Sequence, residues 1–384
     1  MKNKILVFQY VIIVMSLFVL SHFNFEYYVT GEASNYSIYV QMLLFLISFL
    51  FISNSQIALI NIKFRKTIIF FSLVLFITQI PDMLLASSNA AIKNVLHTLA
   101  IPIGYMLGQS IYCTLYDKDE NYSNLWILLL ILPIFYIAYR YLSVLLVDPD
   151  ALFFVILLFP LAFCFKKDVY KIITIVLVGI ICAFSAKRSI LIAYSISLVL
   201  LLLQYSKFVK KEKLSFKSVG IFLGLSVTLY WFVANNSEVI DNILLRFQGI
   251  KDDSGSGRVD LYDILLSSFE NSSLWDKMFG HGYRSAISVL NGIPAHNDFL
   301  EILYDFGFVP LSIYVIILMQ FVFLCLHAIK RQSLNNGTLM LIASVSNIVV
   351  LGSLNNIFID TLFIFLCFLC LGISVGMIKS NQLV

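Results

Sequence analysis

Charged side chains are scarce in this 384-residue sequence. Asp, Glu, Lys and Arg together make up 12% of it, whereas hydrophobic residues make up 60%. Ordinary globular domains carry roughly a quarter charged residues. The shortage excludes a typical water-soluble domain. With a mean hydropathy of +0.91, the chain is expected to be an integral membrane protein.

Cysteine is also infrequent and is not arranged in a framework. The six cysteines are scattered along the chain, and five of them lie in apolar stretches. No set of disulfides is implied. Cys367 and Cys370 form a CxxC motif in "LCFLCLG", but so apolar a setting favours small side chains in a packed core over a redox or zinc site.

No internal repeat is visible. A transporter with twelve spans usually shows two related halves and broken helices near the middle of the membrane. Here the polar residues gather instead in one loop late in the chain, about 235–298. A polysaccharide-unit flippase or transporter is therefore kept only as an alternative of another class.

The remaining sequence supplies long apolar runs almost from end to end. Because a helix needs about 20 apolar residues to cross the hydrocarbon core, these runs predict an all-α polytopic membrane protein with about twelve transmembrane helices. The expected spans are 5–22, 38–56, 67–87, 93–112, 125–147, 151–165, 172–186, 189–206, 218–234, 308–328, 338–355 and 357–378.

Lys and Arg are concentrated in alternate loops, which predicts the orientation, since basic loops stay in the cytoplasm. Both termini are expected to be cytoplasmic, and the 235–298 loop is expected outside. The chain then divides into nine spans (1–234), this large external loop (235–298), and an interfacial helix with three spans (299–384). The basic segments are 1–4, 63–66, 166–171, 207–217, 329–332 and 378–381.

A basic pair sits at the tip of a tight external hairpin in "FSAKRSIL". Lys187 and Arg188 there separate two strongly apolar spans. An ionised side chain in a span costs roughly 2.5–3.5 kcal/mol on insertion scales, and basic residues on the outer side oppose the orientation signal. The pair either snorkels at the membrane surface or has a function.

The large loop contains the segment "DDSGSGR" ahead of a helical pattern. Ser256 is placed to cap a helix that begins near Arg258. Arg258 shares a face with Tyr262, Leu265, Leu266 and Phe269 and should point toward the membrane body. A Gly/Ser-rich lead into a helix with an arginine suits a phosphate group, and the alternative is a flexible surface turn.

The segment "PAHNDFLEILYDFG" precedes the next span. Asp298, Glu301 and Asp305 share one face of a helix expected over 297–306, which should lie at the outer interface with its acids in water. Asp298 and Glu301 resemble a capping box. His296 would then precede the positive helix end, which favours a neutral imidazole that accepts a proton.

At these residues the sequence resembles the O-antigen polymerase and O-antigen ligase superfamily, which assembles bacterial envelope polysaccharide. The resemblance covers roughly residues 180–330. It rests on "SAKRS", on "SGR" with the following Tyr, on the "FGHGYRS" turn, and on His296 and Asn297 followed after nine residues by Gly307.

The resemblance implies a glycosyltransferase of the membrane-embedded C type, which uses a glycan on undecaprenyl pyrophosphate as donor at the periplasmic face of the bacterial inner membrane. Arg258 and Arg188 would bind the pyrophosphate, and His296 would be the base or orienter for the acceptor hydroxyl. No metal and no other cofactor is implied. Further substrate-binding candidates are Lys187, Arg284, Asn297 and Arg140, the last of which could instead pair with Asp148.

Polymerase and ligase share the donor and the motifs. A polymerase passes the growing chain to the next lipid-linked repeat unit, and a ligase passes it to the lipid A core. After the glycine, the ligase pattern usually has two further residues and then Gly, Thr or Tyr, where this chain has Pro310. We therefore expect a polymerase of O-antigen or capsular polysaccharide. Its partners would be lipid-linked glycans, membrane lipid, and a chain-length regulator and flippase; nucleic acid is not among them.

Overall fold

The computed structural model describes residues 2–30, 36–55, 62–85, 87–116, 128–129, 153–165, 168–184, 188–209, 258–330 and 335–380. Within these ranges the secondary structure is helical, with no strand. The long helices are α1 (Lys2–Thr30), α2 (Tyr36–Asn54), α3 (Ile62–Leu85), α4 (Ser88–Ile111), α7 (Asp168–Phe184), α8 (Arg188–Val209), α15 (Phe308–Lys330), α16 (Asn336–Leu354) and α17 (Thr361–Ser380).

Shorter helices connect the long ones or lie beside them. A π-helical turn, η1, continues α4, and a short helix followed by a 3₁₀ turn, η2, precedes α7. The described part of the large loop folds into three short helices, and a fourth leads into α15. These elements are η1 (Tyr112–Tyr116), α6 (Phe153–Leu158), η2 (Phe159–Cys164), α11 (Arg258–Glu270), α12 (Leu274–Phe279), α13 (Ser285–Val289) and α14 (Asp298–Phe306).

Seven of the described helices are long and apolar enough to cross a membrane, which confirms the expected class of an all-helical, multi-pass protein. Three shorter apolar helices coincide with the expected spans 151–165, 172–186 and 189–206. The expected spans 125–147 and 218–234 lie outside the described residues, apart from 128–129. Twelve spans thus stay a prediction. The seven are Lys4–Phe23, Tyr36–Asn54, Phe64–Pro81, Asn89–Thr114, Phe308–Lys330, Asn336–Leu354 and Thr361–Ile378.

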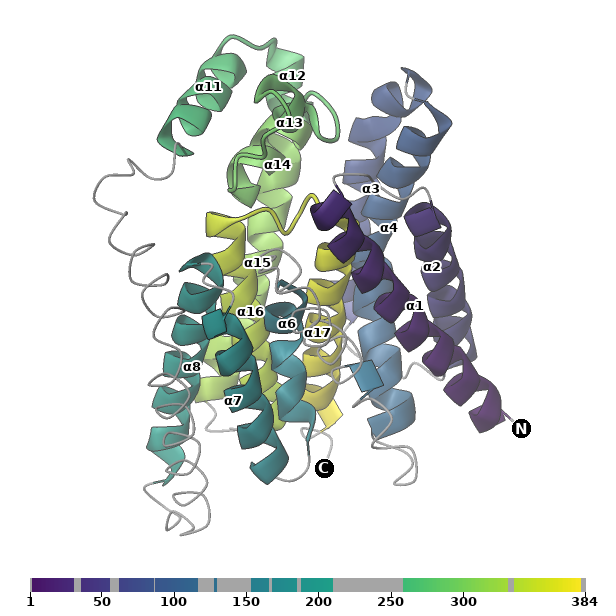
Figure 1. The fold of residues 1–384 in the computed structure, drawn as a ribbon, viewed down its shortest axis with the longest axis vertical. Coiled ribbons are helices and arrows are strands. Elements are labelled where there is room, and N and C mark those ends of the chain that lie inside the picture. The colour runs from purple at the N-terminus through teal and green to yellow at the C-terminus, as the bar shows by residue number, and fades with distance from the viewer. Residues whose placement is uncertain are drawn as a thin grey trace.

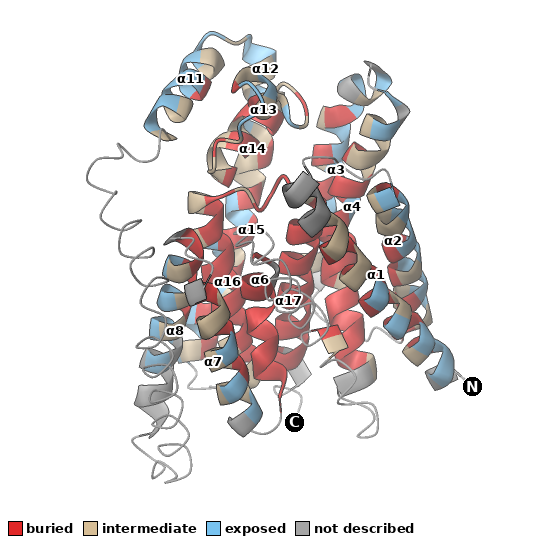
Figure 2. Ribbon diagram, viewed as in Figure 1, coloured by how far each residue is buried: buried red, intermediate tan, exposed pale blue. Residues whose placement is uncertain are grey.

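Helix α17 forms the centre of the bundle. Its apolar span is buried along its whole length, and α1 and α2 carry exposed side chains on their outer faces (Figure 2). Helices α4 and α17 can approach closely because Gly108 and Gly372 have no Cβ. An added Cβ on Gly108 would collide with the carbonyl of Leu369, and one on Gly372 with the carbonyl of Tyr105. Small residues of this kind let membrane helices pack backbone to backbone.

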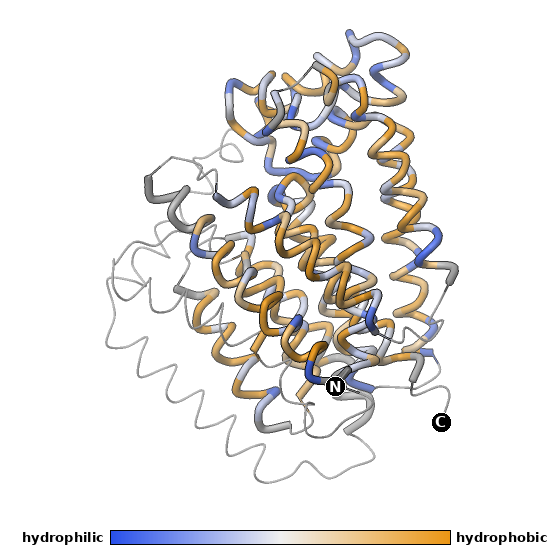
Figure 3. The backbone as a smooth tube through the Cα atoms, turned by 90° about the vertical axis from the view of Figure 1, so that its right-hand side faces the viewer, coloured by the Kyte–Doolittle hydropathy of each residue, from blue (hydrophilic) through white to orange (hydrophobic). Residues whose placement is uncertain are grey.

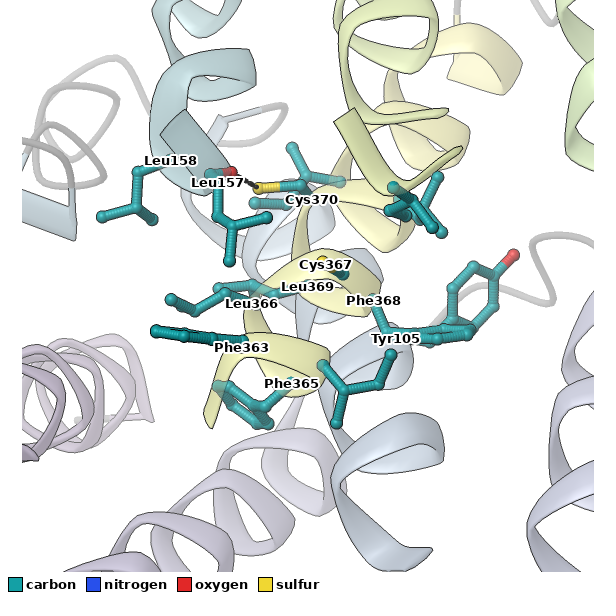
Figure 4. Close-up of a cluster of buried hydrophobic side chains, with 14 of the residues drawn as sticks. Tyr105, Leu157, Leu158, Phe363, Phe365, Leu366, Cys367, Phe368, Leu369 and Cys370 are labelled. Carbon is teal, nitrogen blue, oxygen red and sulfur yellow. Dashed lines mark hydrogen bonds between the residues drawn. The ribbon is translucent and has the colours of Figure 1, made fainter. Parts of the chain in front are cut away.

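The CxxC motif lies inside this core. Cys367 and Cys370 are buried and free, and the Cys370 thiol donates to the Leu157 carbonyl with an Sγ to O distance of 3.5 Å (Figure 4). Large aromatic and leucine side chains from α17 surround both sulfurs. The two cysteines therefore occupy core space, as the apolar setting predicts.

The helices run up and down the bundle. Lys171 Nζ, in the first turn of α7, donates to Asn336 Oδ1 at the start of α16, so α7 and α16 begin at the same end (2.8 Å). Helix α1 begins and α17 ends at that end also, while α11 to α14 and the α16–α17 connection lie toward the other (Figure 1). Hydrophobic residues fill the middle and hydrophilic ones concentrate near the ends (Figure 3). Which end faces the cytoplasm stays a prediction.

Candidate functional site

The connection between α16 and α17, residues 355–360, is the point where the large loop meets the bundle. Three side chains from three segments reach this connection or the helix end beside it: Arg258 of α11, Tyr283 of the "FGHGYRS" turn, and Asp298 of α14. All three contact main-chain atoms. The candidate site is therefore built around the C-terminal end of α16.

Arg258 is the first residue of α11, as the sequence predicts, and points to the membrane body. Its side chain is half-buried, and Nη1 donates to the carbonyl oxygen of Leu354 at 3.1 Å. Leu354 is the last residue of α16. On the same face of α11, Leu265 is buried, but Leu266 is 39% exposed, so this part of the expected apolar face is wrong. The last carbonyls of a helix carry partial negative charge, which a guanidinium stabilises.

Arg188 is the first residue of α8, which starts at the end of the bundle where Arg258 contacts Leu354. Because α7 and α16 begin together and α8 follows α7 after a short connection, α8 begins where α16 finishes. Helices α8 and α16 contact each other near their middles, where Ser197 Oγ donates to Asn347 Oδ1 (2.8 Å). At about 1.5 Å per residue, Arg188 and Leu354 lie at similar heights beyond that contact. The backbone of Arg188 is thus brought to the level of Arg258's partner.

His296 lies two residues before α14, next to its N-cap Asn297, as expected for a residue just ahead of the helix. It is half-buried, with φ of 57°, in the left-handed region. The helix is capped by Asn297, whose Oδ1 accepts the N–H groups of Phe299 (3.0 Å) and Leu300 (3.2 Å). The expected capping box of Asp298 and Glu301 is wrong, because Asn297 is the N-cap and the side chains of Asp298 and Glu301 accept main-chain N–H groups of other segments.

The expectation that the acids of α14 face water is also wrong. Asp298, Glu301 and Asp305 are each 1% exposed. Each carboxylate accepts main-chain N–H groups from segments that cover it: Asp298 Oδ1 from Phe358 (2.9 Å), Glu301 Oε1 from Ala295 (2.6 Å), and Asp305 from Arg284 (2.8 Å) and Ala286 (2.7 Å). The acidic face of α14 therefore organises the surrounding loops.

Asp298 joins the His296 segment to the α16–α17 connection. Besides the bond to Phe358, its Oδ2 lies against Gly352 near the end of α16, where an added Cβ would come within 2.9 Å of it. Arg258 donates to Leu354, two residues after Gly352. The end of α16 therefore contacts Arg258 directly and the His296 segment through Asp298. Sequence reasoning had assigned Asp298 only to a cap.

Burial raises the pKa of two of these carboxyl groups. The pKa of Asp298 lies well above its usual range because of burial, and the pKa of Glu301 is raised by burial and then by the neighbouring Asp298 and Asp305 charges. Within the described residues, Asp298 Oδ2 and Glu301 Oε2 have no hydrogen-bond partner. This favours a neutral carboxyl group that keeps one oxygen as acceptor for the main chain.

These raised pKa values predict a stability that falls as pH rises. Unfolded Asp and Glu have pKa values near about 4, so their contribution is complete below that pH and is lost as pH rises through the higher folded-state pKa. Asp298→Asn and Glu301→Gln mimic the neutral form and should flatten this fall, measured as the unfolding midpoint in detergent from about pH 4 to 8. Asp263→Asn, at an exposed position of α11, is the control, and equal slopes in parent and variants would contradict the prediction.

The other predicted site residues lie in three kinds of place. Arg284 is exposed, adopts a φ of 66° before α13, and holds its guanidinium 5.8 Å from the Tyr283 ring centroid. Asn297 is used in capping. Lys187 and Arg140 lie outside the described residues, as does Ser256. The structure therefore brings Arg258 and the His296 segment to the end of α16 and places the start of α8, at Arg188, toward the same end of the bundle. Arg284 contacts Asp305 through its main-chain N–H.

Tyr283 and Asp360 complete the connection and were missed from the sequence. The Tyr283 hydroxyl donates to the Ile359 carbonyl (2.6 Å), and burial raises its pKa to about 12, so it stays protonated. Asp360 Oδ1 accepts the N–H groups of Leu362 (2.8 Å) and Phe363 (3.0 Å) at the start of α17. The available signal was "DTLF", an acidic residue directly before an apolar run.

A buried histidine also borders the site. His97 of α4 lies with its ring centroid 4.7 Å from that of Tyr283, and neither ring nitrogen has a hydrogen-bond partner in the described part of the chain. Among the described residues, no group of three or more His, Cys, Asp or Glu is placed to hold a metal ion. What the site offers is an arginine at a helix end and a histidine on a segment that Asp298 ties to the same region.

Residues 173–315 match the family model described as O-antigen ligase. This segment contains six of the seven predicted site residues, all but Arg140. The match supports the O-antigen ligase and polymerase superfamily, in agreement with the motifs, and suggests a glycosyltransferase-like membrane enzyme that acts on lipid-linked glycans. No curated protein sequence matches the chain.

Proposed function

We propose that the chain is a polysaccharide polymerase. It transfers the growing glycan from undecaprenyl pyrophosphate to the next lipid-linked repeat unit at the periplasmic face of the inner membrane, with both termini in the cytoplasm. The observation that carries this proposal is the half-buried Arg258 at the C-terminal end of α16, to which Asp298 ties the His296 segment.

Arg258 and Arg188 neutralise the leaving lipid pyrophosphate. A guanidinium has five N–H donors in a planar fork that fits phosphate oxygens and is always charged. Arg258 uses Nη1 for Leu354, so further donors are available for an anion. As the glycosidic bond to the pyrophosphate breaks, negative charge develops on the leaving group, and a pre-positioned cation lowers the barrier.

His296 accepts the proton of the acceptor hydroxyl as that oxygen attacks the sugar. Its backbone is fixed by the left-handed conformation and by the Asn297 cap behind it. A base of this kind must hold a defined position to be effective. Lys187, Arg284, Asn297 and Arg140 are secondary candidates for contacts with the glycan or the pyrophosphate, and a chain-length regulator and a flippase are the proposed protein partners.

O-antigen ligase is the second candidate function, because the matching family model carries that description. It uses the same donor and the same arginines but passes the finished chain to the lipid A core. The polymerase is preferred because Pro310, in the first turn of α15, stands where the ligase pattern has Gly, Thr or Tyr.

Deletion of the gene separates these functions. For a polymerase, the surface polysaccharide on a gel is expected to collapse to a band that carries a single repeat unit, because attachment continues without polymerisation. Complete loss of attached polymer would instead identify the ligase. Complementation with the parent gene is the control for polar effects of the deletion. If strains with Arg258→Ala and with His296→Ala both kept the parent pattern, the catalytic assignment would be wrong.

A further inference from the structure

Helix α12 of the large loop exposes large apolar side chains. Leu274 is 77% exposed and Trp275 is 67% exposed, with Met278 at 37% one turn further on. The helix begins firmly, because Ser273 Oγ accepts the N–H of Asp276 (3.1 Å). Exposed leucine, tryptophan and methionine side chains grouped on one short helix indicate contact with an apolar partner.

This apolar surface continues the outward face of α15. The main chain of α12 at Met278 and Phe279 packs directly on Gly307, where an added Cβ would meet both residues. The next residue, Phe308, is 57% exposed and begins a row along α15, which is a candidate membrane span. The exposed members of that row include Phe308, Val315, Ile316, Met319, Phe323 and Leu326.

We propose that α12 is a lipid anchor at the periplasmic surface of the membrane that the helix bundle crosses. Leu274 and Trp275 enter the boundary between headgroups and acyl chains, beside the point where α15 enters the bilayer. Tryptophan is enriched at this depth because its ring is apolar and its N–H can reach polar groups. The half-buried Asp276 and Lys277 lie on the other side of this short helix and keep it from sinking further. The proposed partner of α12 is therefore membrane lipid. This lipid contact does not depend on the proposed transferase activity.

The anchor holds the C-terminal end of α11 (Figure 1). The chain passes from α11 to α12 through Asn271 to Ser273 only, and His281 Nε2 and Ser272 Oγ, 2.9 Å apart, brace this turn. Near the C-terminal end of α11, the hydroxyl groups of Ser268 and Tyr304 form a hydrogen bond of 2.9 Å that holds α11 against α14. With its C-terminal end held at the lipid surface, α11 presents Arg258 from its other end.

Nitroxide labels test the lipid contact directly. Trp275→Cys and, separately, Leu274→Cys are labelled in the full chain and reconstituted in phosphatidylcholine and phosphatidylglycerol vesicles. Ser288→Cys, at an exposed position of α13 in the same loop, is the matched control. The six native cysteines are buried, and the parent chain taken through the same labelling corrects for any reaction with them. Collision rates with oxygen, which concentrates in lipid, and with a water-soluble nickel chelate are then compared.

The ratio of oxygen to nickel collisions is expected to be severalfold higher at positions 274 and 275 than at position 288. Equal ratios at all three positions would overturn the proposal, because α12 would then face water. Poor access of both reagents to 274 and 275 would overturn it too, since another part of a protein would cover the helix. Dipolar broadening between labels would identify that cover as a second copy of the chain. Each outcome is independent of glycan transfer.

Discussion

Arg258→Ala is expected to lower the rate of glycan transfer by about 10²- to 10³-fold, the loss typical when a preorganised group that stabilises developing charge is removed. Arg258→Lys should recover only part of it, because an ammonium lacks the planar fork. The rate is measured with purified chain in vesicles supplied with lipid-linked repeat units, and the modal polysaccharide length is measured in cells. Lys330→Ala is the control, a basic residue at an exposed position at the end of α15.

A second variant separates charge from structure at this position. Arg258 also donates to the Leu354 carbonyl at the end of α16, so its removal could loosen the site without any role in catalysis. Arg258→Gln retains N–H donors for that carbonyl but has no charge. We expect its unfolding midpoint to stay near that of the parent while transfer stays as low as in the alanine variant. A glutamine variant with the parent rate would contradict a role for the charge.

The start of α11 illustrates what could be predicted from the sequence. The residues from Arg258 onward repeat with helical period, so both the helix over this segment and the inward direction of Arg258 follow from local rules. The apolar spans follow in the same way, because a bilayer demands a fixed length of hydrophobic helix.

The acidic face of α14 illustrates what could not be predicted. The pattern of Asp298, Glu301 and Asp305 gives the correct face, but a polar face seen in a sequence is assigned to water by default. Here loops cover it, and loops carry main-chain N–H groups that need acceptors when they are buried. Carboxylates from one helix satisfy donors in three other segments. Because a main-chain donor has no side-chain signature, its position along the chain leaves no pattern to detect.

The convergence of the site has the same origin. Arg258 finds a carbonyl at Leu354, Asp298 an amide at Phe358, and Tyr283 a carbonyl at Ile359. All three partners are main-chain atoms of the last residue of α16 or of the connection that follows it, far along the chain. The motifs predict which residues are candidates for the chemistry, whereas the α16–α17 connection near which two of them are held is visible only in three dimensions.

His296→Asn is expected to lower transfer by about 10²- to 10⁴-fold, the usual contribution of a positioned general base. Asparagine tolerates the left-handed conformation that His296 adopts, so the backbone before α14 should be kept and the unfolding midpoint little changed. His296→Ala confounds the two effects, because alanine is strained at a φ of 57°. His327→Ala, exposed near the far end of α15, is the control.

His296→Gly makes the assignment sharper, because glycine adopts positive φ without strain and leaves space where the imidazole was. If His296 takes the acceptor proton, added imidazole should restore part of the lost transfer, with a saturable dependence on its concentration, and should leave the asparagine and parent rates unchanged. If His296 only holds the loop, the glycine and asparagine variants should both transfer at nearly the parent rate. Loss of transfer in both variants without any response to imidazole would assign His296 to orientation of the acceptor through a direct bond, and the base would have to be sought elsewhere at the end of α16.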